Sequence, residues 1–269
     1  MVSVTGAVSA RISRFQATLQ RKSFAHYRES LAEDLSFEQA VNKYPDRNAL
    51  YAYMHHYLWH IAPAEIRHHR SYFSQRRRGF GEDAFHAMWW LLLRDYQPQR
   101  ALEIGVYRGQ ITSLMGLIAK LCAFPCEVHG ISPFSSAADT VSKYRKNIDY
   151  LDDAIASNRS FGLPDPNFIK ALSTDTIATE HIRSRAWNVI YVDGNHDYEV
   201  ALADYKVCRD ALAHNGLLVM DDSSLYTDYR PAKFSFAGHP GPSRVVHELA
   251  CSELRFLGGV GHNNVFTIC

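Results

Sequence analysis

The chain has 269 residues, of which 46% are hydrophobic and 21% are charged, a composition typical of a globular protein that buries a full core. Its formal net charge of +1 provides no field that would attract nucleic acid, so we expect no nucleic-acid partner. The longest apolar run, Ala87–Leu93, is far shorter than the ~20 residues of a membrane helix, so we expect no membrane partner either.

We expect no secretory signal in the N-terminal segment, because its first residues lack a continuous apolar core and include Arg11 and Arg14. The five cysteines are scattered along the chain without a CxxC pair, which is typical of reduced thiols. We therefore expect a cytoplasmic protein.

Residues 1–97 are predicted to form helices only. Apolar residues recur at helical spacing in three segments, residues 37–43, 48–61 and 83–96, which Pro45, Pro63 and Pro98 separate. After Pro98 the pattern changes to short apolar runs between helical stretches, which predicts a parallel sheet with crossover helices. We place the boundary between a helical N-terminal region (1–97) and a second domain (98–269) at this change.

The second domain is predicted to be an α/β, Rossmann-like, doubly wound sheet of seven strands. The expected strands are residues 101–104, 127–131, 167–170, 187–192, 217–220, 255–257 and 265–268. The last two are joined by seven residues, too few for a parallel crossover, so we expect an antiparallel hairpin and one reversed strand at the C-terminal edge.

Two connections are longer than usual. Residues 135–166 contain a predicted charged helix, 140–155, and residues 223–243 contain the aromatic side chains Tyr226, Tyr229, Phe234 and Phe236. Long aromatic loops in compact domains are often functional, so the second loop is a candidate binding lid, and a packed surface loop is the alternative.

Acidic residues follow two of the predicted strands. Asp193 ends the strand at 187–192 and is followed three residues later by His196, and Asp221 and Asp222 end the strand at 217–220. If these strands are neighbours, three carboxylates meet at one sheet edge, as a hard cation such as Mg²⁺ requires, beside an imidazole that can accept a proton. Taken singly, each acid could instead cap a helix or begin a loop.

Other histidines are weaker candidates. His239 and His262 lie in glycine-containing loops at the same predicted edge. The remaining group lies on helical segments without nearby acidic or thiol partners, and we interpret its members as surface or packing residues: His55, His56, His60, His68 and His69.

A glycine-bearing turn follows the first strand. It runs from Glu103 through Gly105 to Gly109 and leads into a predicted helix. The glycines let a ligand approach the backbone closely, and the start of the helix offers free N–H groups. The spacing differs from the G-x-G-x-x-G of dinucleotide sites, and an acidic residue beside the turn would favour an amino group over a pyrophosphate. A plain strand-to-helix turn is the alternative.

With this E-x-G-x-x-x-G motif the chain resembles the class I S-adenosylmethionine-dependent methyltransferases. The segments 193–198 and 215–222 extend the resemblance to the branch with metal-dependent sugar O-methyltransferases of macrolide and aminocoumarin biosynthesis and cephalosporin hydroxylase-like proteins. The resemblance covers roughly residues 79–269 and implies S-adenosylmethionine as methyl donor, Mg²⁺ held by Asp193, Asp221 and Asp222, and His196 as general base.

The resemblance also implies a set of donor-binding residues: Glu103, Gly105, Tyr107, Arg108, Gly109, Ser132, Ser173 and Asp193. Two positions depart from the family pattern. Ser132 stands where an acidic residue commonly holds the ribose, and Ile111 replaces a small polar residue after the second glycine. A hydroxyl holds the ribose more weakly than a carboxylate, so donor affinity is in question.

The sequence thus predicts a Mg²⁺-dependent O-methyltransferase that acts on a hydroxyl with a neighbouring oxygen, on a sugar or other natural product. Similar enzymes use a helical N-terminal part as a lid or for assembly, so the resemblance implies a homo-oligomer and a closing role for residues 79–83. An ordinary helix start, with Glu82 and Asp83 placed favourably against the helix dipole, is the alternative for these residues. Two alternatives stay open: an oxygenase-associated protein of the cephalosporin branch, for which no two-His-one-carboxylate pattern is evident in the sequence, and a noncatalytic cofactor-binding subunit.

Overall fold

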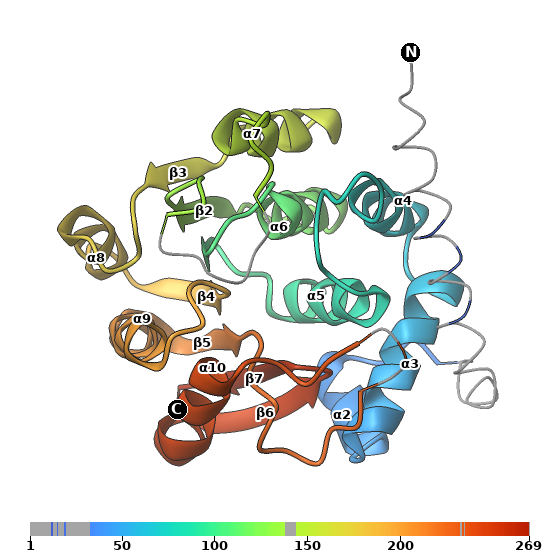
Figure 1. Cartoon of the computed structure of the whole chain (residues 1–269). Coiled ribbons are helices and arrows are strands. Elements are labelled where there is room, and N and C mark those ends of the chain that lie inside the picture. The colour runs from blue at the N-terminus through green and yellow to red at the C-terminus, as the bar shows by residue number, and fades with distance from the viewer. Residues whose placement is uncertain are drawn as a thin grey trace.

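The computed structural model describes residues 12, 15, 19, 33–137, 144–231, 233 and 235–268. Its centre is a seven-stranded sheet in the order β3-β2-β1-β4-β5-β7-β6 (Figure 1). The strands are β1 (Arg100–Ile104), β2 (Glu127–Ser132), β3 (Asn167–Lys170), β4 (Trp187–Val192), β5 (Leu212–Met220), β6 (Arg255–Val260) and β7 (Asn263–Thr267). The predicted fold class and all seven predicted strands are confirmed.

One detail of the predicted sheet is wrong. The pairs among β3, β2, β1, β4 and β5 are parallel, and β7 is antiparallel to both β5 and β6. The reversed strand therefore lies one position inside the edge, and the edge strand β6 runs in the direction of β5. The hairpin turn at Gly261 and His262 explains this order, because the chain folds back from β6 into the place beside β5.

The helices cover both faces of the sheet. They are α2 (Phe37–Lys43), α3 (Arg47–His60), α4 (Ala64–Phe73), α5 (Asp83–Tyr96), α6 (Gln110–Leu121), α7 (Tyr150–Ser160), α8 (Thr176–Arg183), α9 (Tyr198–Asp210), α10 (Pro240–Val245), a π-helical turn (Val246–Ala250) and α11 (Cys251–Glu253). The three predicted N-terminal helices are confirmed, and α4 was not predicted because its many charged and histidine residues weaken the apolar pattern. No helix of the described residues has the length and apolar content needed to span a membrane.

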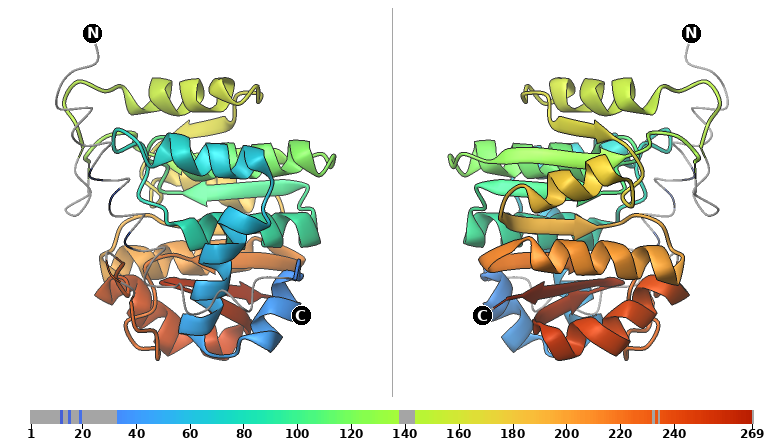
Figure 2. Two further views of the ribbon diagram at one scale, coloured as in Figure 1. Left: turned by 90° about the vertical axis from the view of Figure 1, so that its right-hand side faces the viewer. Right: turned by 90° about the vertical axis from the view of Figure 1, so that its left-hand side faces the viewer.

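The alternating strand residues divide into two hydrophobic cores, one on each side of the sheet. Figure 2 shows the helices that cover the two faces. Val189, Tyr191 and Val219 point toward α3, α5 and α6, whereas Ile190 and Leu218 point toward α8, α9 and α10. The N-terminal helices α3 and α5 thus cover one face of the sheet together with α6. In this packing His55, His56 and His69 are fully enclosed, so they are packing residues and not surface residues.

The helix predicted at 140–155 is displaced. Residues 138–143 lie outside the described residues, and the following residues are not helical until α7 begins at Tyr150. The cause is a helix cap: the Asp149 side chain accepts hydrogen bonds from the Leu151 and Asp152 N–H groups, which stabilises a helix start at that position.

Candidate active site

The carboxyl ends of β1, β2, β4 and β5 open into one cavity of about 610 Å³. This is where the topology of a doubly wound sheet places a ligand site. Nine of the predicted site residues line it: Glu103, Gly105, Tyr107, Ser132, Ser173, Asp193, His196, Asp221 and Asp222. Arg108 and Gly109 do not.

The predicted glycine turn has the backbone that its sequence requires. Gly105 has a φ of +102°, and a Cβ at this position would lie 1.7 Å from the carbonyl oxygen of Asp193. Gly109, with a φ of +76°, is the N-cap of α6. Both positions therefore disfavour larger residues. Gly105 lets the end of β1 pass close to the residue after β4, and Gly109 lets the start of α6 approach Ala154 of α7.

Glu103 lies behind this turn, where its carboxylate accepts a hydrogen bond from the Thr112 N–H at 3.0 Å. Burial raises the pKa of Glu103 to about 8, although the Thr112 hydrogen bond opposes the shift. The side chain thus ties β1 to α6 while it lines the cavity.

Aromatic and hydroxyl side chains surround the β1 and β2 end of the cavity. The Tyr107 ring packs against Phe80, Tyr144 and Tyr150 at centroid distances of 4.9–5.4 Å. The Ser132 hydroxyl accepts a hydrogen bond from the Phe134 N–H at 3.2 Å. Together with Glu103 and Ser173, these residues form what we call the donor half of the cavity.

Arg108 has a structural position. It forms an ion pair with Asp153 of α7 at 2.6 Å and donates hydrogen bonds to the backbone carbonyls of Arg76 and Arg77. Because residues 79–81 line the cavity just beyond these carbonyls, Arg108 anchors the segment that forms the cavity wall.

Acidic residues gather at the β4 and β5 end, which we call the acidic half. The Asp193 and Asp221 side chains follow neighbouring parallel strands, in which Val192 pairs with Met220, so their charges influence each other. Burial and the charges of Asp221 and Asp222 hold the pKa of Asp193 well above its usual range. Burial also opposes charge on Asp221, but the nearby His262 outweighs it and lowers the Asp221 pKa. Asp193 is therefore the protonated member of the pair.

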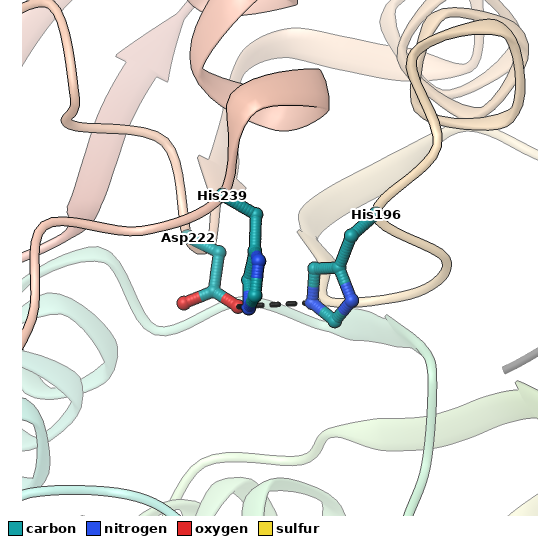
Figure 3. Close-up of side chains that lie close together, drawn as sticks. All are labelled: His196, Asp222 and His239. Carbon is teal, nitrogen blue, oxygen red and sulfur yellow. Dashed lines mark ion pairs between the residues drawn. The ribbon is translucent and has the colours of Figure 1, made fainter. Parts of the chain in front are cut away.

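Two histidines contact Asp222 from different loops. His196 Nε2, from the loop after β4, lies 2.9 Å from Asp222 Oδ2, and His239 Nε2, from the end of loop 223–243, lies 3.6 Å from the same oxygen (Figure 3). The two imidazole rings are 4.1 Å apart between centroids. Burial and the neighbouring His196 lower the pKa of His239.

His262 contacts the acids from a third direction, the turn between β6 and β7. Its Nε2 atom lies 3.3 Å from Asp221 Oδ1 and 3.6 Å from Asp222 Oδ1. Burial opposes charge on this ring, but Asp221, Asp222 and Glu82 outweigh it and raise the His262 pKa to about 10. His262 was predicted only as a weaker candidate, and 40 residues separate it from Asp222 along the chain.

The donor atoms needed for a cation are present at this end. Among the described residues, two groups of three donor atoms lie within 4.8 Å of one another: His196, Asp222 and His239, and Asp221, Asp222 and His262. Asp193 belongs to neither group. Asp221 Oδ1 is buried without a hydrogen-bond partner, an arrangement that a bound cation would satisfy, so the residues fit a divalent ion.

Loop 223–243 closes this end of the cavity. Phe236 and His239 line it, and the loop is tied to the N-terminal helices by hydrogen bonds from the Ser235 hydroxyl to Glu82 and from the Arg230 N–H to Asn48. Phe234 lies outside the described residues. The described part of the loop packs against the N-terminal helices and also contributes to the cavity wall. It thus has features of both predicted alternatives, a packed surface loop and a binding lid.

Comparison with known proteins agrees with the fold. Residues 102–223 match the family model described as a methyltransferase domain. An O-methyltransferase from Bacillus cereus, solved in complex with SAH, aligns with a TM-score of 0.54 and 12% identity over 79% of this chain and 95% of that one. The SAH-bound Podospora anserina methyltransferase PaMTH1 aligns with a TM-score of 0.52 and 14% identity over 77% and 88%. No curated protein matches the chain in sequence.

The fold is therefore that of these SAH-bound methyltransferases, and residues 102–223 are similar to a methyltransferase domain. The helical N-terminal region precedes this domain.

Proposed function

We propose that this protein transfers a methyl group from S-adenosylmethionine to a hydroxyl of a small-molecule acceptor, with a divalent cation at the acidic half of the cavity. The observation that carries the proposal is the position of the acids: Asp193, Asp221 and Asp222 line the same cavity as the glycine turn, with His196 Nε2 2.9 Å from Asp222. A methyl donor and an activated hydroxyl can thus share one enclosed space.

The residues divide the work between the two halves. The donor half offers the side chains of Tyr107, Ser132 and Ser173 to S-adenosylmethionine. Residues 79–81 also line the cavity, which supports the proposal that the N-terminal region acts as a lid. A cation such as Mg²⁺, bound by Asp221 and Asp222 beside Asp193, would orient an acceptor with two neighbouring oxygens and increase the acidity of its hydroxyl.

Deprotonation is assigned to His196. As the acceptor oxygen takes the methyl group from the sulfonium, its proton passes to the imidazole, and S-adenosylhomocysteine and a methyl ether result. The Asp222 carboxylate, 2.9 Å from Nε2, orients the ring and stabilises the imidazolium that forms. The acceptor class we propose is a sugar or another natural product with vicinal oxygens.

The test is methyl transfer by the purified chain. We expect S-adenosylhomocysteine to form from S-adenosylmethionine with vicinal diols in the presence of Mg²⁺, and chelation to stop it. Calorimetric titration with S-adenosylmethionine should give one site. The absence of donor binding with and without Mg²⁺ would refute the proposal and favour a noncatalytic subunit.

A second function is favoured by one observation. His196, His239 and Asp222 form a two-His-one-carboxylate group, the ligand set of nonhaem Fe(II) oxygenases, which was not evident in the sequence. Turnover that requires Fe(II) and O₂, and not S-adenosylmethionine, would identify this function instead.

A further inference from the structure

We infer that His262 is a nitrogen ligand of the cation site and that, with Asp221 and Asp222, it makes a site that selects a first-row transition ion over Mg²⁺. The inference rests on the cation site of the proposed function but not on its methyl-transfer step. It adds to the predicted acidic ligands a residue of the β6–β7 turn, which is distant in sequence but lies beside Asp221.

The hydrogen bonding of the ring directs the correct nitrogen to the acids. His262 Nδ1 lies 3.2 Å from the backbone carbonyl oxygen of Phe236. Because a carbonyl only accepts, Nδ1 carries a proton and donates it there. Nε2 is the nitrogen that faces Asp221 and Asp222, and its lone pair becomes available to a cation when the cation displaces the Nε2 proton. Histidines that bind metals typically have this arrangement, with the second ring N–H donated to a carbonyl or carboxylate.

The distances suit three ligands of one ion. His262 Nε2 lies 3.3 Å from Asp221 Oδ1 and 3.6 Å from Asp222 Oδ1, yet Asp221 Oδ1 is buried and has no hydrogen-bond partner. The short contact is thus not a well-formed hydrogen bond. Two atoms that each bind one ion at about 2.1 Å lie about 3 to 3.5 Å apart, which agrees with these separations.

The ring is also fixed in place. It lies between the rings of Phe85 and Phe236, with centroid distances of 4.6 and 4.7 Å, and the His262 carbonyl accepts a hydrogen bond from the Ser223 N–H at 2.9 Å. Ser223 directly follows Asp222, so one backbone hydrogen bond connects the β6–β7 turn to the acidic pair. A ligand held in this way is preorganised for binding.

The donor set then determines the class of ion. Mg²⁺ prefers oxygen ligands and retains several waters, whereas imidazole nitrogen suits Fe²⁺, Ni²⁺, Cu²⁺ and Zn²⁺. At a site with both donor types the affinity for transition ions rises from Mn²⁺ through Fe²⁺ to Co²⁺, so Mn²⁺ is the most stringent probe. A site with two carboxylates and one imidazole therefore favours these transition ions. The acceptor oxygens of the proposed reaction would face such an ion.

The experiment measures metal binding by the full chain without substrate. Titration with Mn²⁺, followed by electron paramagnetic resonance, and competition with Mg²⁺ should show Mn²⁺ binding at least about tenfold more tightly. In H262Q the Mn²⁺ affinity should fall by about tenfold or more, while the Mg²⁺ affinity changes by less than about threefold. H214Q, at an exposed histidine on β5, is the matched control and should leave both affinities unchanged.

Two outcomes would overturn the inference. One is wild-type Mn²⁺ affinity in H262Q, above all if H239Q loses it, because the ion would then be held by the other histidine pair. The other is the absence of ¹⁴N coupling in pulsed spectra of Mn²⁺-loaded H196Q/H239Q protein, which lacks the other two candidate histidine ligands and so decides the matter if H262Q does not fold. Donor binding is measured separately, so loss of S-adenosylmethionine binding with intact Mn²⁺ binding would refute the proposed function alone.

Discussion

The donor half and the acidic half of the cavity satisfy their polar groups in different ways. In the donor half Glu103 accepts from the Thr112 N–H and Ser132 from the Phe134 N–H, so backbone groups already provide partners. In the acidic half Asp221 Oδ1 is buried without a hydrogen-bond partner, and Asp222 is contacted by three imidazoles.

This difference suits the donor half to binding S-adenosylmethionine and the acidic half to the chemical step. Backbone hydrogen bonds form with the fold, so the donor half is complete before any ligand arrives. Three carboxyl groups at one sheet edge repel one another and are costly to desolvate, so they need a proton, an imidazolium or a cation between them. Burial and the charges of Asp221 and Asp222 raise the pKa of Asp193, so one of the three carboxyl groups retains a proton when no cation is bound.

Substitution in the acidic half should have the largest effect on activity. We expect Asp222→Asn to reduce methyl transfer by about 10³-fold or more, since it removes a cation ligand and the partner of His196 together. Asn keeps the shape and tolerates the positive φ of +49° at this position. Steady-state kinetics and Mn²⁺ titration measure the loss, and Asp210→Asn, at the exposed end of α9, is the control. Activity within tenfold of wild type would contradict the assignment of the cation and the chemical step to the acidic half.

In the donor half the largest effect should be on stability, from a substitution that the backbone conformation does not tolerate. Gly105→Ala should lower the free energy of unfolding by about 3 kcal/mol or more, because the new Cβ would lie 1.7 Å from the Asp193 carbonyl oxygen and φ is +102°. Gly162→Ala is the matched control: its φ is also positive, at +63°, but its Cβ would meet only the Lys120 Nζ atom at 3.4 Å. It should cost about 1 kcal/mol. Equal losses in denaturant titrations would contradict the steric argument.

Next in size is the effect of the proposed base. His196→Gln should slow methyl transfer by about 10²-fold while donor affinity stays within about threefold, since the residue acts on the acceptor proton. The kinetics are compared with those of His214→Gln across the pH range. A loss below threefold at every pH would remove His196 from this role and weaken the assignment of chemistry to the acidic half.

Local patterns in the sequence predicted more of the donor half than of the acidic half. The strand ends, the glycine turn at Gly105 and the meeting of Asp193 with Asp221 follow from hydrophobic runs and parallel topology. His262 was predicted at this edge only as a weaker candidate. Its contact with Asp221 and the contact of Glu82 with Ser235 did not follow, because they depend on a hairpin that inserts beside β5 and on helix packing across the sheet. The cap at Asp149 was missed for a different reason, since charged residues on both sides of it fit one continuous helix.

The smallest expected effect concerns Ser132, where an acidic ribose ligand is usual in the resembling family. Ser132→Ala should weaken S-adenosylmethionine binding by about three- to tenfold in calorimetric titration, the value of one neutral hydrogen bond. Ser135→Ala is a close control, because the Ser135 hydroxyl also accepts a hydrogen bond from the N–H two residues later, at 3.2 Å, but is exposed. If both variants weaken binding equally, the turn and not the ribose contact is responsible. If Ser132→Ala alone weakens donor binding, the Ser132 hydroxyl holds the ribose, at the position where the resembling family commonly has a carboxylate.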